Sequence, residues 1–167
     1  MGRMNTNAEL IYFHRYERHK GFYKERDIDN ALLSIRFADY VDIPDDEECP
    51  YFSANELLRG SCHIFALGLE KVLGYTPYII EGKNNKSFHA FCQIFKSGTW
   101  FYVDARGVTT SFDEFMDVAK EFVTDEYIIR PVEADDIAEW RDDKKYHDEA
   151  LSFAVQVITK YRNYYSL

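Results

Sequence analysis

Three side chains of the types used in covalent catalysis, a thiol, an imidazole and a carboxylate, occur in the order Cys62, His89 and Asp104. Cys62 directly follows a Gly-Ser pair and begins a stretch whose apolar residues have helical spacing. The first N–H groups of a helix lack carbonyl partners and carry the positive end of its dipole, so they stabilise a thiolate there. They also stabilise the oxyanion formed when a thiolate attacks a carbonyl. Cys62 is therefore a candidate nucleophile.

The other two candidates lie on a predicted β-hairpin with a tight turn at Ser97-Gly98. If the turn has two residues, Lys96 pairs with Thr99. This register places His89 and Asp104 on one face as diagonal neighbours, and a shift of one residue would separate them. His89 would then act as base and acid, and Asp104 would fix its tautomer, as in a catalytic triad.

Each of these residues also has an ordinary structural interpretation. A cysteine in an apolar stretch is most often a small core residue, and a lone histidine in a strand is most often part of the core or of an edge. An aspartate before Ala-Arg-Gly is often a turn former. The combination of a helix start with a hairpin that unites the other two residues favours the catalytic interpretation.

A zinc site is a competing interpretation, because four residues of ligand type occur in two pairs. They are Cys62, His63, His89 and Cys92. Positions three apart on a strand point to opposite faces, so His89 and Cys92 should diverge. We expect Cys92 to face the core with Phe88, Ala90 and Ile94, Cys49 to be a bystander in an acidic loop, and the protein to need no metal or cofactor.

The rest of the sequence predicts the elements that must position these residues. Helices are predicted at 27–41, 62–74 and from 111, where Ser111 and Glu114 are spaced as a capping box, and over 135–165 in one or two pieces. Strands are predicted at 76–82, 87–95, 99–107 and 125–132, and a surface loop at 42–50. This order predicts an α+β fold in which the helix bearing Cys62 packs on an antiparallel sheet.

Composition limits the class of protein. The 167 residues have the size of one domain, so we expect residues 1–167 to fold as a single unit. The net charge of -9 argues against a nucleic-acid partner, because phosphates attract a basic surface. No apolar run reaches the roughly 18 residues of a membrane span, and no signal segment begins the chain. We therefore expect no membrane association and a cytoplasmic location with free thiols; the oligomeric state is open.

Three segments, "GSCHIFALGLEKVLGY", "FHAFCQIF" and "GTWFYVDARG", resemble the core of the transglutaminase-like and papain-like Cys-His-Asp superfamily. In that superfamily the nucleophile begins a central helix packed on an antiparallel sheet, the histidine begins one strand and the aspartate lies on the next. The resemblance implies a papain-like cysteine-protease fold with Cys62, His89 and Asp104 as the triad. It spans about residues 56–110, and its Cys-to-His interval is short for the superfamily.

We expect a thiol enzyme that forms an acyl-enzyme through Cys62 and passes the acyl group to water or to an amine. The substrate would be a peptide, a protein or a small amide, and the activity that of a cysteine protease or of a transglutaminase-like enzyme. Asn55 is a possible second oxyanion donor by side-chain type.

Two alternatives remain open. The chain is also similar to arylamine N-acetyltransferases, which share this core and have an Arg-Gly before the cysteine, although no basic cluster for the coenzyme A phosphates is visible. A protein-binding module that keeps the fold without the chemistry would suit the many tyrosines.

Overall fold

The computed structural model describes residues 21–33, 35, 53–142 and 148–167, and all structural statements concern these residues. The helical elements are α2 (Glu25–Leu32), the π-helical turn η2 (Glu56–Gly60), α3 (Cys62–Leu73), α4 (Phe112–Ala119), α5 (Ala134–Asp142), α6 (Asp148–Lys160) and α7 (Arg162–Tyr165). The strands are β1 (Pro77–Gly82), β2 (Phe88–Lys96), β3 (Thr99–Asp104), β4 (Gly107–Thr109) and β5 (Tyr127–Pro131). Within the described part of the chain, no helix is long and apolar enough to cross a membrane.

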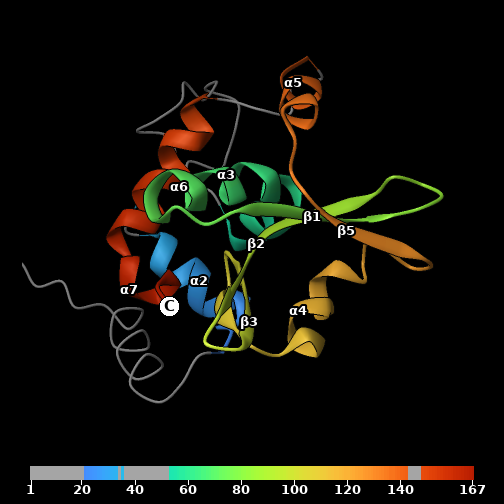
Figure 1. Ribbon diagram of the computed structural model, residues 1–167. Coiled ribbons are helices and arrows are strands. Elements are labelled where there is room, and N and C mark those ends of the chain that lie inside the picture. The colour runs from blue at the N-terminus through green and yellow to red at the C-terminus, as the bar shows by residue number, and fades with distance from the viewer. Residues whose placement is uncertain (1–20, 34, 36–52, 143–147) are drawn as a thin grey trace, which may run out of the picture.

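The strands form one antiparallel sheet in the order β4-β3-β2-β1-β5 (Figure 1). The first four follow one another along the chain as hairpins, and β5 joins the far edge beside β1. The turn between β2 and β3 is a two-residue turn at Ser97 and Gly98, both with positive φ, so Lys96 pairs with Thr99. The predicted register of this hairpin is confirmed.

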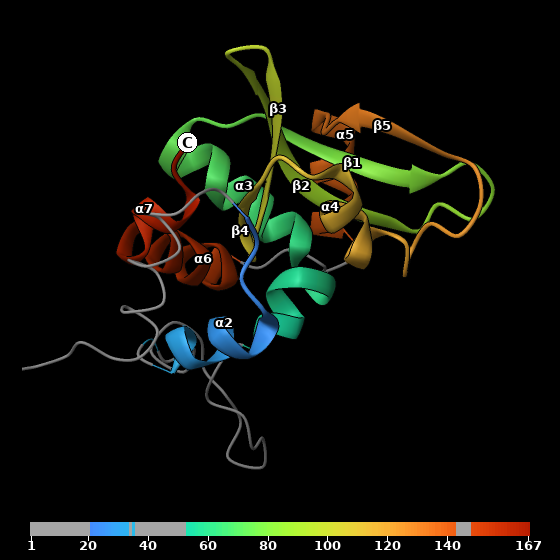
Figure 2. The ribbon, with the colours of Figure 1, turned by 90° about the horizontal axis from the view of Figure 1, so that it is seen from below.

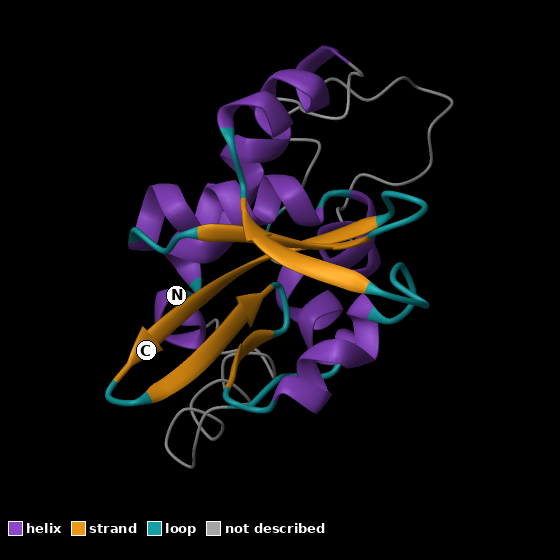
Figure 3. Cartoon of the chain, turned by 45° about the vertical axis from the view of Figure 1, so that its right-hand side comes forward, coloured by secondary structure: helices purple, strands orange, loops and turns teal. Residues whose placement is uncertain are grey.

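Helices cover both faces of the sheet, which gives three layers (Figures 2 and 3). On one face, α3 lies between the sheet and α6, and the larger core cluster joins these helices to α2, η2 and α7. On the other face, α4 packs on a smaller cluster that includes Ile80, Phe91 and Phe115. The protein is therefore of the α+β class with a helix-covered antiparallel sheet, as expected.

The central helix α3 is buried over most of its length, from Cys62 to Leu69. Its sequence is apolar on nearly all sides, which a helix tolerates only when other elements surround it. Gly68 lets α6 approach closely, because a β-carbon at this position would lie 3.0 Å from Ile158 Cδ1. The helix ends at Gly74, whose φ of 74° is the left-handed conformation favoured after a helix. The predicted helix of about three turns beginning at Cys62 is confirmed.

The structure corrects the expected helices at both ends of the chain. The helix predicted at 27–41 begins at Glu25 and ends at Leu32, and Ile35 lies in a bend whose N–H bonds back to Leu32; residues 36–41 and the predicted loop at 42–50 lie outside the described residues. In the described residues of the 135–165 pattern there are three helices, α5, α6 and α7, rather than one or two.

Two further predictions fail in detail. The strand predicted at 99–107 ends at Asp104, because Ala105 and Arg106 form a tight turn into β4, which was not predicted. The capping box at α4 is half formed: Ser111 accepts the N–H of Glu114, but the Glu114 carboxylate accepts the N–H of Phe22 instead. This second contact ties the N-terminal segment, which here means residues 21–24 before α2, to the sheet beside β4, where Phe22 bridges to Gly107.

Candidate active site

Cys62 occupies the first position of α3, where the helix meets the beginning of β2. Its sulfur accepts the backbone N–H of Ala90 at 3.3 Å, and the residue is 4% exposed. The side chain of the preceding Ser61 does not cap the helix, so it does not take up the N–H groups of the first turn. The sulfur therefore lies at the positive end of a buried helix with one backbone donor already directed at it.

His89 and Asp104 lie on the adjacent strands β2 and β3, as the hairpin register predicts. His89 Nε2 is 3.2 Å from Asp104 Oδ2, and both side chains are buried. His89 Nδ1 has no hydrogen-bond partner among the described residues. Because Nε2 is directed at Asp104, Nδ1 is the ring nitrogen that remains available to the Cys62 sulfur, whose charge raises the pKa of the imidazole.

Sequence reasoning missed the partner that fixes Asp104. Arg106 lies two residues further, at the turn into β4, and its side chain folds back so that Nε is 3.1 Å from Asp104 Oδ1 and Nη2 is 2.7 Å from Oδ2. Its backbone N–H also donates to Oδ1 at 2.9 Å. The carboxylate thus forms the turn and holds the histidine at the same time, so the turn-former and the triad interpretations of Asp104 are compatible. An arginine two residues after an aspartate at a turn was the available signal.

Arg106 is in turn held in a fixed position by three neighbours. Its Nη1 and Nη2 donate to the carbonyl oxygens of Glu114 and Phe115 at the start of α4, and the guanidinium lies 4.0 Å from the centre of the Phe22 ring. A planar guanidinium with all these contacts cannot rotate away from the carboxylate. The N-terminal segment, α4 and the β3–β4 turn therefore converge on Asp104.

Aromatic rings surround the imidazole of His89. The Phe91 and Phe122 rings are nearly parallel to it, with centroids 6.3 and 6.2 Å away, and Phe115 lies at 5.9 Å. These rings bury the imidazole, which by itself lowers the pKa of His89. A positive charge on the imidazole therefore depends on Asp104 and Cys62.

The charges of the site are coupled. Burial by itself would raise the pKa of the Cys62 thiol, but hydrogen bonds from His63 and His89, the charge of His89 and the Ala90 N–H outweigh it and lower the pKa to about 6. Burial would lower the pKa of His89, yet the bond to Asp104 and the interaction with Cys62 raise it to about 9. Burial would raise the pKa of Asp104, while Arg106 and His89 hold it well below its usual range. Both shifts favour a thiolate at Cys62 and an imidazolium at His89 at neutral pH.

Sequence reasoning also missed the role of His63, which entered only as a possible ligand in the competing zinc interpretation. It follows Cys62 on α3, is buried, and its ring contacts Trp140 at 5.0 Å and Phe88 at 6.4 Å between centroids. Its hydrogen bond is the largest single contribution that lowers the pKa of the thiol. No periodicity rule distinguishes such a histidine from a core residue, so its role becomes visible only in the structure.

A pocket of about 350 Å³ is lined in part by Cys62. Cys62 and His63 form its floor, Arg59 and Gly60 come from η2, residues Asn85 to Phe88 come from the β1–β2 turn and the start of β2, and Phe122 follows α4. A substrate carbonyl in this pocket would reach the sulfur and the N-terminal end of α3 together.

The other candidates are not brought to this pocket. Asn55 does not line it, and its side-chain oxygen accepts a hydrogen bond from Arg59. Cys92 faces the core cluster on the α3 side of the sheet, where burial raises the pKa of its thiol well above the ordinary value. His89 belongs to the opposite face, and the described residues contain no cluster of metal-ligand type. Cys49 lies outside the described residues.

Comparisons of the chain with known protein families, with curated proteins and with solved structures find no match. The chemistry of the site alone therefore carries the inference about function.

We predict that Cys62 is alkylated by iodoacetamide with an apparent pKa of about 6, so that the rate is nearly constant from neutral to mildly alkaline pH. Replacing His89 with alanine removes the charge that stabilises the thiolate, and the midpoint should move toward the value of about 8.5 of a free cysteine. Alkylation followed against pH with mass-spectrometric mapping measures this. Labelling should be lost in Cys62→Ser, and an unchanged midpoint in His89→Ala would contradict the ion pair.

Arg106→Met should destabilise the protein by about 3 to 5 kcal/mol, because it leaves the buried carboxylate of Asp104 without its charged partner. The matched control is Arg59→Met, which removes an arginine that also pairs with two carboxylates but is more exposed, and which should cost about 1 kcal/mol or less. Urea unfolding at neutral pH measures both losses. Equal losses in the two variants would show that Asp104 does not depend on Arg106.

Proposed function

We propose that the protein is a thiol enzyme that attacks amide or related acyl bonds through Cys62, with His89 as acid and base and Asp104 as the group that orients the imidazole. The observation that carries this proposal is the position of the buried Cys62 at the first residue of α3, where it lines a pocket, together with a buried His89 whose Nε2 is 3.2 Å from Asp104. This environment also lowers the pKa of the Cys62 thiol to about 6. A purely structural cysteine gains nothing from a lowered pKa, whereas a nucleophile requires it.

In the proposed reaction the Cys62 thiolate attacks the carbonyl carbon, and a carbon–sulfur bond forms as the carbonyl electrons move to oxygen. The N–H groups at the start of α3, with that of Cys62 first among them, stabilise the oxyanion. When the carbon–nitrogen bond breaks, the imidazolium of His89 protonates the leaving amine. Water, or a second amine, then attacks the thioester while His89 takes its proton, and the sulfur leaves as thiolate.

We also propose for the chain the fold of the transglutaminase-like and papain-like superfamily. The support is a nucleophile at the start of a central helix, with histidine and aspartate on the next two strands of the hairpin. Arg106 adds a second partner for the aspartate. The triad serves hydrolysis and amide exchange equally, and hydrolysis of a peptide or isopeptide bond is the first choice because water needs no binding site of its own.

Acetyl transfer from coenzyme A is the weaker candidate. Its phosphates would need free cationic groups beside the thiol. Of the two cationic residues that line the pocket, Arg59 is already paired with Glu25 and Glu121, which leaves Lys86. One lysine is a poor match for several phosphate groups.

We predict that p-nitrophenyl acetate acetylates Cys62 in a rapid burst of about one equivalent, followed by slower turnover. Cys62→Ser should lose the burst, and the acetyl group should map to the peptide that contains Cys62. Addition of methylamine separates the two reactions: N-methylacetamide as the main product indicates amide exchange, and acetate indicates hydrolysis. A burst that persists in Cys62→Ser, or no burst in the folded wild-type protein, would contradict the proposal.

A further inference from the structure

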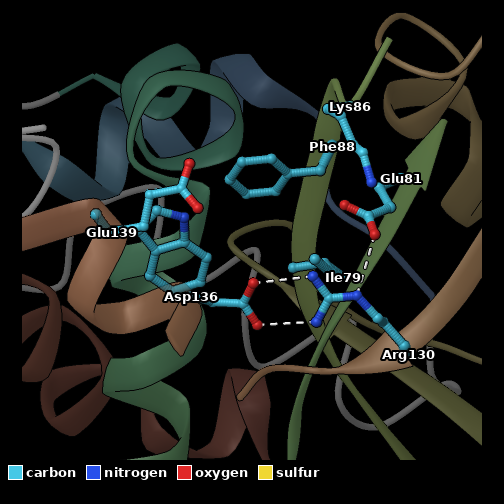
Figure 4. A pocket seen from close by; sticks show the side chains of 8 residues that line it. Ile79, Glu81, Lys86, Phe88, Arg130, Asp136 and Glu139 are labelled. Carbon is cyan, nitrogen blue, oxygen red and sulfur yellow. Dashed lines mark hydrogen bonds and ion pairs between the residues drawn. The ribbon is translucent and has the colours of Figure 1, made fainter. Parts of the chain in front are cut away.

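A second pocket, of about 370 Å³, lies beside the one above Cys62, between the β1–β5 edge of the sheet and α5 (Figure 4). Its apolar part consists of Ile79, Phe88 and Trp140. The charged groups around it are the carboxylates of Glu81, Asp136 and Glu139 and the cations Lys86 and Arg130. The pocket thus combines an aromatic floor with an excess of one negative charge.

The two pockets share a wall. Lys86 and Phe88 line both of them. The ring of Phe88 stacks on Trp140, with centroids 5.8 Å apart, and both rings contact the ring of His63 beside the nucleophile. A substrate whose carbonyl lies at Cys62 can therefore continue across Phe88 into the second pocket.

Arg130 is fully occupied and does not serve as an anion receptor. Its Nε donates to Glu81 at 3.0 Å, and its Nη1 and Nη2 each donate to Asp136 at 2.9 Å. Asp136 also accepts the N–H of Glu133 at the start of α5. Arg130 and Asp136 therefore hold α5 against the sheet and neutralise each other's charge; Figure 4 shows the two bonds between them as dashed lines.

The charged side chains of the pocket that remain available to a ligand are mostly negative. Glu81 uses only Oε1 for Arg130, and among the described residues no hydrogen bond or ion pair engages its Oε2 or the side chains of Glu139 and Lys86. Glu81 is 8% exposed, so its carboxylate lies in a low-dielectric environment where a cation is attracted more strongly than at the surface. The net charge of -9 adds a general attraction for cations.

We propose that this second pocket is a substrate subsite that takes a cationic side chain on an aliphatic stem, as in a lysine or arginine residue of a peptide close to the bond that Cys62 attacks. The proposal rests on the proposed function. The stem would lie on Phe88 and Trp140, and the charged end would lie between Glu81 and Glu139. Lys86, which lines both pockets, repels the cation and so limits the affinity of the pocket for it.

Equilibrium binding to the Cys62→Ala protein tests the pocket without any chemistry at the thiol. The probes are three peptides, acetyl-Ala-Lys-Ala amide and its norleucine and glutamate counterparts, titrated by calorimetry. The lysine peptide should bind about two- to fivefold more tightly than the norleucine peptide, the range expected for a partly exposed charge pair, and the glutamate peptide should bind most weakly.

Two variants change this preference in opposite directions if the proposal holds. Glu139→Gln should remove most of the advantage of the lysine peptide, and Lys86→Gln should enlarge it, since Glu139 attracts the cation and Lys86 repels it. Neither side chain has a hydrogen-bond or ion-pair partner among the described residues, so neither change removes such a bond. The matched control is Glu133→Gln, which removes an exposed carboxylate of the same segment that does not line the pocket and should leave all three affinities unchanged.

Equal affinities for the lysine and norleucine peptides, or the same shift in Glu133→Gln as in Glu139→Gln, would overturn the subsite. Either of these results, together with normal acetylation of wild-type Cys62 by p-nitrophenyl acetate, would leave the proposed function intact. Selective binding of the lysine peptide with an inert wild-type thiol would support the pocket and refute the reaction.

Discussion

The carboxylate of Asp104 is the group on which the site depends. It is buried, and a lone buried carboxylate is costly enough that it would take up a proton instead. Four donors prevent this: the backbone N–H, Nε and Nη2 of Arg106, and Nε2 of His89. Arg106 reaches Asp104 only because the chain turns at once into β4 and because α4 and Phe22 close over the guanidinium. The N-terminal segment, the short edge strand and α4 therefore all contribute to a single fixed negative charge.

That fixed charge determines the state of the other two groups. With Asp104 ionised, an imidazolium at His89 becomes favourable despite its burial. The positive His89, the N-terminus of α3 and the neighbouring His63 then favour a thiolate at Cys62. The charges alternate from Arg106 through Asp104 and His89 to Cys62, so loss of one member weakens the next. The sulfur at the end of this series is the one group that faces the pocket.

Local patterns in the sequence were sufficient to predict the elements that carry the site. The start of α3 at Cys62 followed from apolar spacing after a Gly-Ser pair, and the His89–Asp104 contact followed from the length of the turn at Ser97 and Gly98. The roles of Arg106 and His63 did not follow, because each depends on where a side chain points after elements distant in sequence have packed. The second pocket was equally hidden, since it joins β1 and β5 to α5 through the pairing of Arg130 with Asp136.

The most direct test of the account is the protonation state of His89 at neutral pH, observed by NMR of the ring nitrogens in histidine-labelled protein and assigned by its loss in His89→Gln. The account predicts that both ring nitrogens carry a proton in the wild-type protein and that the ring titrates near pH 9. In Cys62→Ala, which removes the thiolate, the ring should lose its proton at a lower pH. A wild-type His89 that is neutral at pH 7, or one whose titration does not change in Cys62→Ala, would contradict the thiolate–imidazolium pair.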